Sequence, residues 1–357
     1  MKERSKPTFI LTETLMRKPF LKLTIYILIL FIGIASGIFL TQNKTTMALI
    51  KKPIEETYKK FDDTRETEWS EDFKIVDIKS GTDNNIQKAY FFKAKSNQAK
   101  PLIISLHTWS GYYYQTDDIA KICKEKDINY IHPDFRGANW TKDACCSELA
   151  LNDIDDAISY AVENSNVDPG RIYVVGVSGG GYATLSTFMR SKHKINKFSA
   201  WASISDLIAW YNESKIMGNK YAENILECTD AKNGLNIENA KQRSPIYWKT
   251  PIEKLTSSKL SIYAGIYDGI QGSVPITHSI NFYNKLLTDL SVSDTSKYVT
   301  DSEKLKLLEF RKPLGEFGSI AGRKVFLRKE FGNLSLIIFE GNHEMLTEFA
   351  VSELLEE

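Results

Sequence analysis

The sequence predicts an α/β fold with a doubly wound, mostly parallel sheet of eight strands. Short apolar runs recur along the chain, and helical patterns separate the later runs, as crossover connections between parallel strands require. A chain of 357 residues, 42% of them hydrophobic, can bury the core of one extended α/β domain. The expected strands are residues 73–78, 88–93, 102–106, 129–132, 172–177, 200–204, 260–264 and 335–339.

Two long segments interrupt this alternation. Residues 206–258 precede the seventh strand, and residues 290–333 precede the eighth. We expect the first segment to form a helical cap, because it carries several aromatic residues of the kind that line a substrate cleft. The whole domain, with this cap, is expected to span residues 69–357.

The stretch from Arg171 to Tyr182 is typical of a nucleophile elbow. Residues 172–175 are β-branched or aromatic and uncharged, as a strand buried on both faces requires. A Gly-x-Ser-x-Gly pentapeptide centred on Ser178 follows, and residues 179–185 then open an apolar helix. Glycines surround the serine because the sharp turn imposes strained backbone angles and close strand–helix packing. The motif therefore predicts Ser178 as a nucleophile at the tip of the turn.

Suitable partners for Ser178 follow in the order that this elbow requires, acid before histidine. Asp268 and His343 each come just after one of the last two predicted strands. The carboxyl ends of parallel strands share one edge of the sheet, so we expect the three side chains in one crevice. His343 would take the serine proton as general base, and Asp268 would orient the imidazole. The remaining four histidines are expected in structural roles: His107, His132, His193 and His278.

Several motifs together resemble the catalytic domain of the prolyl oligopeptidase family of α/β-hydrolases. The resemblance runs from about residue 100 to the C-terminus and rests on DPGRIYVVGVSGGGY at 168–182, PDFRG at 133–137, YDG at 267–269 with Val274, Pro275 and Ser279 after it, and GNH at 341–343. It implies an α/β-hydrolase fold with Ser178, Asp268 and His343 as the catalytic triad. It also implies that the backbone N–H of Gly179 donates to the oxyanion.

The chain departs from the family in the loop after the third strand. That loop is usually His-Gly-Gly-Pro-like, whereas here it reads His-Thr-Trp-Ser-Gly at 107–111. The second oxyanion donor is therefore open among Thr108, Trp109 and a tyrosine of 112–114. We expect aromatic residues of this loop and of the cap to bind substrate, with Tyr112, Tyr113 and Trp210 as the candidates. The family's peptidases carry a β-propeller before the catalytic domain, and too few residues precede the first hydrolase motif here to form one.

The N-terminal segment predicts one transmembrane helix. Residues 23–40 carry no charge, and basic residues outnumber acidic ones in residues 1–22, an asymmetry that keeps the N-terminus cytoplasmic. We expect a single-pass membrane protein whose catalytic domain is extracytoplasmic and tethered by a polar linker, residues 41–68. The alternative is a protein secreted after signal cleavage at the small residues 35–37.

Cysteine spacing argues against a metal site. Adjacent Cys145 and Cys146 cannot present the separated pairs that a tetrahedral zinc site prefers. In an oxidising compartment one of them, with Cys145 as our candidate, is expected to form a disulfide with Cys228. Cys123 is expected to be a free buried thiol. The acidic run Asp153, Asp155 and Asp156 is expected on a solvated helix face rather than around a metal ion.

These observations predict a serine hydrolase that works through an acyl-enzyme and needs no cofactor. A net charge of +1 and the absence of a basic stripe give no support for nucleic-acid binding. The expected substrate is a small-molecule ester or a short peptide. We favour a carboxylesterase on small or glycan-linked esters because a propeller is missing. The alternatives are a prolyl oligopeptidase-like serine peptidase on short peptides and a non-catalytic binding module with the same fold.

Overall fold

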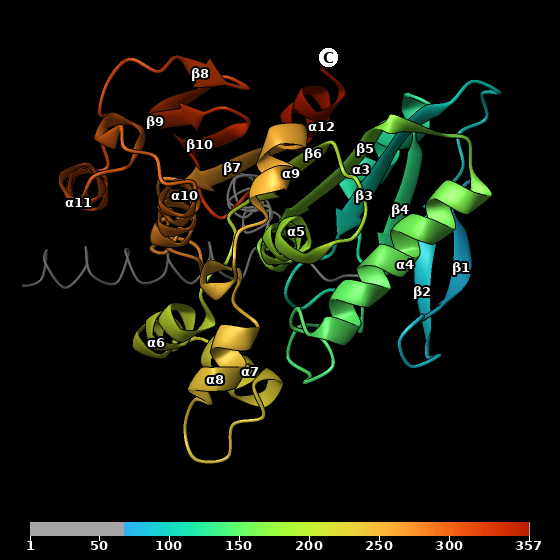
Figure 1. Cartoon of the computed structure of the whole chain (residues 1–357), viewed down its shortest axis with the longest axis horizontal. Helices are drawn as coiled ribbons and strands as arrows, with labels where there is room; N and C mark the ends of the chain where they lie inside the picture. Colours follow the sequence, from blue (N-terminus) through green and yellow to red (C-terminus); the bar gives the residue numbers. More distant parts are fainter. Residues whose placement is uncertain (1–67, 357) are drawn as a thin grey trace, which may run out of the picture. The chain divides into compact units, whose positions relative to one another are not determined.

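Six parallel strands form the centre of a ten-stranded mixed sheet in the computed structural model, which describes residues 68–356 (Figure 1). The strand order is β1-β2-β4-β3-β5-β6-β7-β10-β9-β8, and the run from β4 to β10 is parallel, whereas both edges pair antiparallel. The strands are β1 (Lys74–Lys79), β2 (Ile86–Phe92), β3 (Lys100–Leu106), β4 (Asn129–Pro133), β5 (Val167–Val177), β6 (Lys197–Trp201), β7 (Lys259–Gly265), β8 (Ser319–Ile320), β9 (Arg323–Phe331) and β10 (Leu334–Phe339).

The sheet corrects the prediction of eight strands in two ways. All eight expected strands are present, but β8 and β9 add an antiparallel edge inside residues 290–333, where no strand was expected. Charged residues interrupt the apolar pattern of β9, as on an edge strand, so its sequence does not read as a buried strand. The sixth strand also ends earlier than expected, at Trp201, because Ala202 takes a left-handed φ of 45°.

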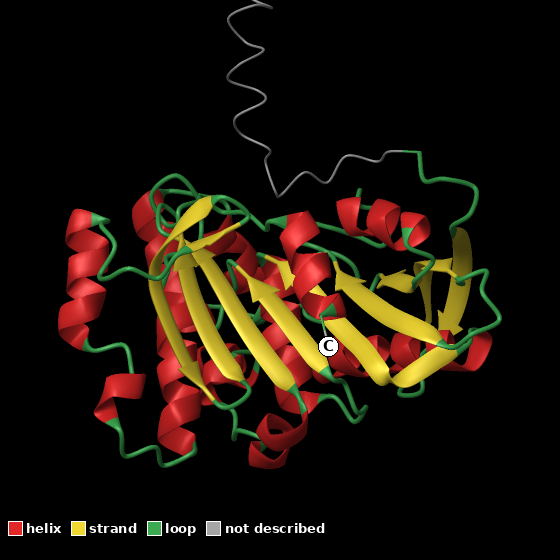
Figure 2. Cartoon of the chain, turned by 90° about the horizontal axis from the view of Figure 1, so that it is seen from above, coloured by secondary structure: helices red, strands yellow, loops and turns green. Residues whose placement is uncertain are grey.

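Helices cover both faces of the sheet (Figure 2), as a doubly wound fold requires. One core cluster holds residues of α4, α5 and α10, such as Ile154, Leu185 and Leu286, and a second cluster holds residues of α3 and α12, such as Ile119 and Val351. The helices outside residues 206–258 are α3 (Asp118–Glu125), α4 (Glu148–Asn164), α5 (Gly179–Arg190), α10 (Thr277–Asp289), the short η2 (Thr295–Lys297), α11 (Asp301–Phe310) and α12 (Thr347–Leu355).

The insertion at residues 206–258 is helical, as the sequence predicts. It forms α6 (Leu207–Met217), α7 (Tyr221–Cys228), α8 (Ile237–Gln242), η1 (Pro245–Tyr247) and α9 (Ile252–Ser257). Figure 1 shows α6, α7 and α8 grouped together, apart from the helices that cover the sheet. We call the group α6 to α8 the cap below.

Two residues of the acidic run on α4, Asp153 and Asp155, are buried, contrary to the expectation of a solvated helix face, whereas Asp156 is half-buried. Asp153 is 1% exposed and accepts hydrogen bonds from Arg136 Nε at 2.6 Å and from Ser80 Oγ at 2.6 Å. Asp155 accepts from Ser191 Oγ at 2.5 Å. These carboxylates are buried because polar groups from other segments satisfy them, which a pattern within one helix does not reveal.

Across residues 68–356, no helix combines the length and the hydrophobicity needed to cross a bilayer. The predicted transmembrane segment, residues 23–40, lies outside the described residues, as do residues 1–22 and most of the predicted linker.

Candidate active site

Ser178 occupies the turn between β5 and α5. Its backbone adopts φ 60° and ψ −120°, a strained conformation for a non-glycine residue. Two glycines beside it allow close backbone packing. A β-carbon on Gly176 would lie 2.4 Å from the carbonyl carbon of Gly180, and one on Gly180 would lie 2.1 Å from the carbonyl oxygen of Leu106. The local geometry is therefore that of a nucleophile elbow, with glycines at the positions where the fold requires them.

Asp268 and His343 are hydrogen-bonded to each other. The distance from His343 Nδ1 to Asp268 Oδ2 is 2.7 Å. The other carboxylate oxygen, Oδ1, accepts from the backbone N–H groups of Gly269 at 2.8 Å and Val274 at 3.0 Å. Because a carboxylate only accepts hydrogen bonds, His343 donates from Nδ1 and its Nε2 carries the lone pair that a general base needs.

All three candidates follow the carboxyl ends of parallel strands. Ser178 follows β5, Asp268 follows β7 and His343 follows β10, so they belong to the same edge of the sheet. In residues 68–356, no hydrogen bond joins Ser178 Oγ to His343. Catalytic hydrogen bonds are often loose without substrate and tighten in the reacting complex. The structure therefore pairs acid with base and presents the serine from the neighbouring elbow.

The oxyanion loop, residues 107–111, approaches the elbow through Trp109. A β-carbon on Gly179 would lie 2.2 Å from the Trp109 backbone nitrogen, so the two backbones are in direct contact. Gly179 is the first residue of α5, where the helix offers no acceptor to its N–H group. The backbone N–H of Thr108 instead donates to Gln115 Oε1 at 3.1 Å. The Thr108 N–H thus already has an acceptor, and Gly179 and Trp109 remain the candidate oxyanion donors.

Gln115 is a residue that the sequence analysis did not single out. Its side-chain oxygen also accepts from Thr108 Oγ1 at 3.0 Å, and a β-carbon on Gly111 would lie 2.0 Å from it. The Gln115 side-chain amide therefore fixes the conformation of the oxyanion loop by bonding to Thr108 and packing against Gly111. No sequence signal identifies this role, because it depends on how the loop folds back on itself.

The aromatic substrate candidates fall into two groups. Trp210, on α6, packs edge-on against Trp109 with ring centroids 4.7 Å apart, and its Nε1 donates to the Ser273 carbonyl at 2.8 Å. It thus lies between the oxyanion loop and the loop that follows Asp268. The rings of Tyr112 and Tyr113 contact a separate aromatic group of Tyr90, Tyr114 and Trp140. A role of these two tyrosines in substrate binding stays a prediction.

The other histidines have structural partners. His107 stacks on Phe135 at 3.8 Å, its ring nitrogens face two backbone carbonyls, and burial lowers its pKa. His278 lies 2.8 Å from Glu213 of the cap. His132 bonds to the Ser105 carbonyl at 2.8 Å, and burial lowers its pKa to about 4. His193 bonds to the Asp155 carbonyl at 2.9 Å.

The four cysteines are free buried thiols, so the expected disulfide between Cys145 and Cys228 is not formed in the structure. Cys145 Sγ lies 3.9 Å from Tyr182 Oη, and Cys228 Sγ donates to the Ile225 carbonyl at 3.7 Å. Cys123 is a buried thiol on α3, as expected, and burial raises its pKa.

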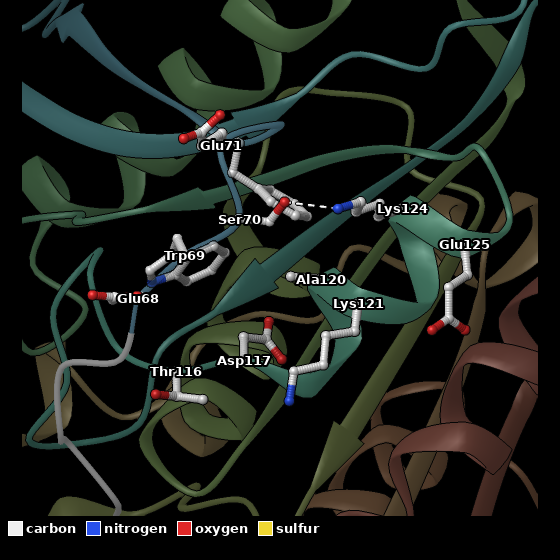
Figure 3. A pocket seen from close by; sticks show the side chains of 11 residues that line it. Glu68, Trp69, Ser70, Glu71, Thr116, Asp117, Ala120, Lys121, Lys124 and Glu125 are labelled. Carbon is white, nitrogen blue, oxygen red and sulfur yellow. Dashed lines mark hydrogen bonds between the residues drawn. The ribbon is translucent and has the colours of Figure 1, made fainter.

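A pocket of about 550 Å³ lies apart from these residues. It is formed by residues 68–71, Phe73, residues 116–117 and one side of α3, and its lining includes Trp69, Asp117 and Lys124. Figure 3 shows Lys124 directed toward Ser70, to which it donates a hydrogen bond of 2.7 Å. None of the triad or oxyanion candidates lines this pocket.

Solved structures with a similar fold are peptidases of larger size. A puromycin-hydrolysing peptidase of Mycobacterium tuberculosis is 15% identical with a TM-score of 0.51, over 79% of this chain and 37% of that chain. An acylaminoacyl peptidase of Pyrococcus horikoshii is 18% identical with a TM-score of 0.49, over 62% of this chain and 36% of that one. This chain therefore spans little more than a third of the length of these relatives. A search of curated proteins found no match.

The sequence match is stronger evidence of kinship than these distant structures. Residues 114–303, more than half of the chain, match the sequence model of the prolyl oligopeptidase family. The matched region contains the nucleophile elbow, the cap and Asp268. The α/β-hydrolase fold expected from the sequence is confirmed. The chain belongs to the prolyl oligopeptidase family.

Proposed function

We propose that this protein cleaves short peptides through an acyl-enzyme on Ser178. The observation that carries the proposal is the 2.7 Å hydrogen bond from His343 Nδ1 to Asp268 Oδ2, at the sheet edge where the elbow presents Ser178. This bond leaves His343 Nε2 ready to accept a proton. It also allows the buried carboxylate to stabilise the imidazolium that forms.

The reaction has two steps. Ser178 Oγ attacks the substrate carbonyl carbon, its proton passes to His343 Nε2, and the negative charge on the carbonyl oxygen is stabilised by the N–H groups of Gly179 and Trp109. His343 then protonates the leaving amine as the scissile bond breaks. Water attacks the acyl-enzyme with the same proton transfers in reverse, which releases the acid and restores Ser178.

The family match supports a peptide over an ester as the substrate. The sequence analysis preferred a carboxylesterase, on the ground that a propeller is missing. Membership in a family of peptidases now favours the amide bond instead. An ester is chemically easier to cleave by the same steps. The experiment must therefore distinguish esterase activity from peptidase activity.

Active-site labelling tests this proposal. The full chain should react with a fluorophosphonate probe, and the Ser178→Ala variant should not, with mass mapping placing the label on Ser178. Short peptides should then slow labelling more than matched acetylated sugars or aryl esters, and amide substrates should be turned over. A folded protein that resists labelling would favour the binding module, and protection by esters alone would favour the esterase.

We further propose that residues 23–40 anchor the protein as a single-pass membrane helix with the catalytic domain outside the cytoplasm. The uncharged run and the excess of basic residues before it support this orientation. The full chain should stay with membranes after carbonate extraction, and external protease should release an active domain. An N-terminus beginning near residue 38 in the mature protein would instead establish signal cleavage.

A further inference from the structure

One peptide group joins the cap to the proposed catalytic acid. Trp210 Nε1, on α6, donates a hydrogen bond to the Ser273 carbonyl at 2.8 Å. The next backbone N–H, that of Val274, donates to Asp268 Oδ1 at 3.0 Å. The Ser273 carbonyl and the Val274 N–H belong to the same planar peptide group, in which they point in opposite directions. A hydrogen bond that fixes this carbonyl oxygen therefore also fixes the direction in which the N–H donates.

The bond from Val274 differs from the second bond to the same carboxylate oxygen. The N–H of Gly269 donates to Asp268 Oδ1 at 2.8 Å, but Gly269 directly follows Asp268 and moves with it. Val274 lies six residues further along the chain, so its N–H reaches the carboxylate from across the loop. The direction of this N–H therefore depends on the group that holds the other end of the peptide.

Packing fixes the indole that holds this peptide. The Trp210 side chain is fully buried, edge-on to Trp109 at 4.7 Å and stacked on Tyr221 at 4.9 Å between ring centroids. A second contact joins α6 to α10, because Glu213 Oε2 lies 2.8 Å from His278 Nε2. The N–H of a ring enclosed in this way has one direction available, and it affects a reaction through the groups that it orients.

We propose that Trp210 is a positioning residue for the catalytic acid. Its Nε1–H fixes the peptide between Ser273 and Val274, and this peptide fixes the carboxylate. With Oδ1 held by the peptide, Oδ2 of Asp268 stays directed at His343 Nδ1. Hydrogen bonds in a chain also polarise one another, so the indole strengthens the donor that lies beyond it. The inference rests on the proposed function, in which His343 is the base that Asp268 orients.

Two replacements of Trp210 remove the N–H donor from the full chain. Trp210→Phe keeps an aromatic ring of smaller size, whereas benzothienylalanine, incorporated at this position, exchanges the N–H for sulfur and keeps the size of the ring system. Both should slow labelling of Ser178 by the fluorophosphonate probe by about tenfold, as the loss of one buried hydrogen bond does. With p-nitrophenyl acetate, kcat should fall while KM changes by less than about twofold, because orientation of the base affects the transition state rather than binding.

Trp248→Phe is the matched control. Trp248 lies in the same insertion and is buried, and its Nε1 donates to the Gln242 carbonyl of α8 at 3.1 Å. This variant loses the same ring volume and the same kind of hydrogen bond as Trp210→Phe. It should unfold at a similarly lowered temperature but react with the probe at the wild-type rate. An equal loss of labelling in Trp248→Phe would show a general effect of loosening the insertion and would overturn the inference.

A double-mutant cycle tests whether Trp210 acts through Asp268. Asp268→Ala leaves no carboxylate to position, so adding Trp210→Phe to it should change the labelling rate by less than about twofold. If the loss of about tenfold persists in this background, the indole acts by another route, such as its packing on Trp109. That result would overturn the inference.

The outcomes separate this inference from the proposed function. If Ser178 is labelled and the benzothienylalanine variant reacts at the wild-type rate, the N–H of Trp210 has no such role, and the proposed function stands. Slow labelling of Trp210→Phe alone would then reflect ring volume. Absence of labelling in the folded wild-type protein would overturn both proposals.

Discussion

Gly272 packs directly against Asp268: a β-carbon on this glycine would lie 2.3 Å from Asp268 Oδ1. The same β-carbon would lie 2.4 Å from His343 Cβ, so Gly272 packs against both residues of the pair. Gly272 belongs to the loop whose Val274 N–H donates to the carboxylate. Its lack of a side chain therefore allows the loop to close over the Asp268–His343 pair.

Gly272→Ala should impair catalysis without unfolding the protein. The added methyl must displace either the carboxylate or the imidazole, and misplacing a catalytic group by about 1 Å costs on the order of 10²-fold in rate. We expect kcat/KM and the rate of fluorophosphonate labelling to fall together. Gly170→Ala is the control, because a β-carbon there meets only an aspartate side-chain oxygen at 3.3 Å. Wild-type activity in Gly272→Ala would contradict the prediction, because it would show that the loop moves to make room for the methyl group without displacing Asp268 or His343.

Asp268→Asn should lower kcat by about 10⁴-fold, as removal of a triad carboxylate does in serine proteases. The amide retains the size of the side chain, but it no longer stabilises the imidazolium and no longer enforces protonation of His343 at Nδ1. The backbone donors from Gly269 and Val274 lose a charged acceptor as well. The check is single-turnover kinetics alongside thermal unfolding. An undiminished rate would move the catalytic acid to another residue.

Gly179→Ala should act on the oxyanion hole. Its β-carbon would lie 2.2 Å from the Trp109 nitrogen and 2.4 Å from Trp109 Cα, so the loop must move away from the elbow. Loss of one oxyanion donor costs about 10² to 10³ in kcat. We expect kcat to fall with a smaller change in KM, measured by steady-state kinetics on an activated ester. A rise in KM alone would show that the loop binds substrate rather than the transition state.

His132 should make stability fall in acid. Burial lowers its pKa from 6.5 to about 4, so between these values the unfolded chain binds more protons than the folded one. The free energy of unfolding that the neutral, buried imidazole supports is fully present above pH 6.5. It falls by at most about 3 kcal/mol as the pH drops toward 4. The pKa of His107 is also lowered by burial and acts in the same direction.

The variant that isolates His132 is His132→Asn, whose amide can still donate to the Ser105 carbonyl. Urea unfolding between pH 7 and pH 4.5 should show a shallower pH dependence for the variant than for the wild type. Equal slopes would mean that a buried water or a local opening relieves the charged imidazole.

Cys145 and Cys228 should form a disulfide when the protein is oxidised. Burial opposes ionisation of Cys145, but the neighbouring Cys228 thiol and the charge of Arg243 outweigh it and lower the pKa of Cys145. The resulting thiolate would attack glutathione disulfide, and Cys228 would then displace glutathione, so that two protons and two electrons leave the pair. Non-reducing peptide mapping should find the crosslink, and Cys145→Ser should abolish it. Alkylation of Cys228 at unchanged yield after oxidation would exclude the pair.

Local pattern was sufficient to predict most of the fold and to propose the catalytic residues. Short sequence motifs predict the elbow at Ser178 and the polar residues that follow β7 and β10, because strand burial and turn formation depend on residues close in sequence. The chain order then placed Asp268 and His343 at one sheet edge. The edge strand β9 was not predicted because charged residues interrupt its apolar pattern.

Tertiary structure alone decided which groups meet. The Trp109 nitrogen approaches Gly179, whereas the Thr108 N–H donates to the Gln115 side chain. The helix face with Asp153 is buried because Arg136 from another loop neutralises it. The contact of Lys220 with Ser110 joins the cap to the oxyanion loop in the same way. Sequence periodicity reports whether a residue is buried, but the partner that satisfies a buried polar group comes from a distant segment and is selected by packing.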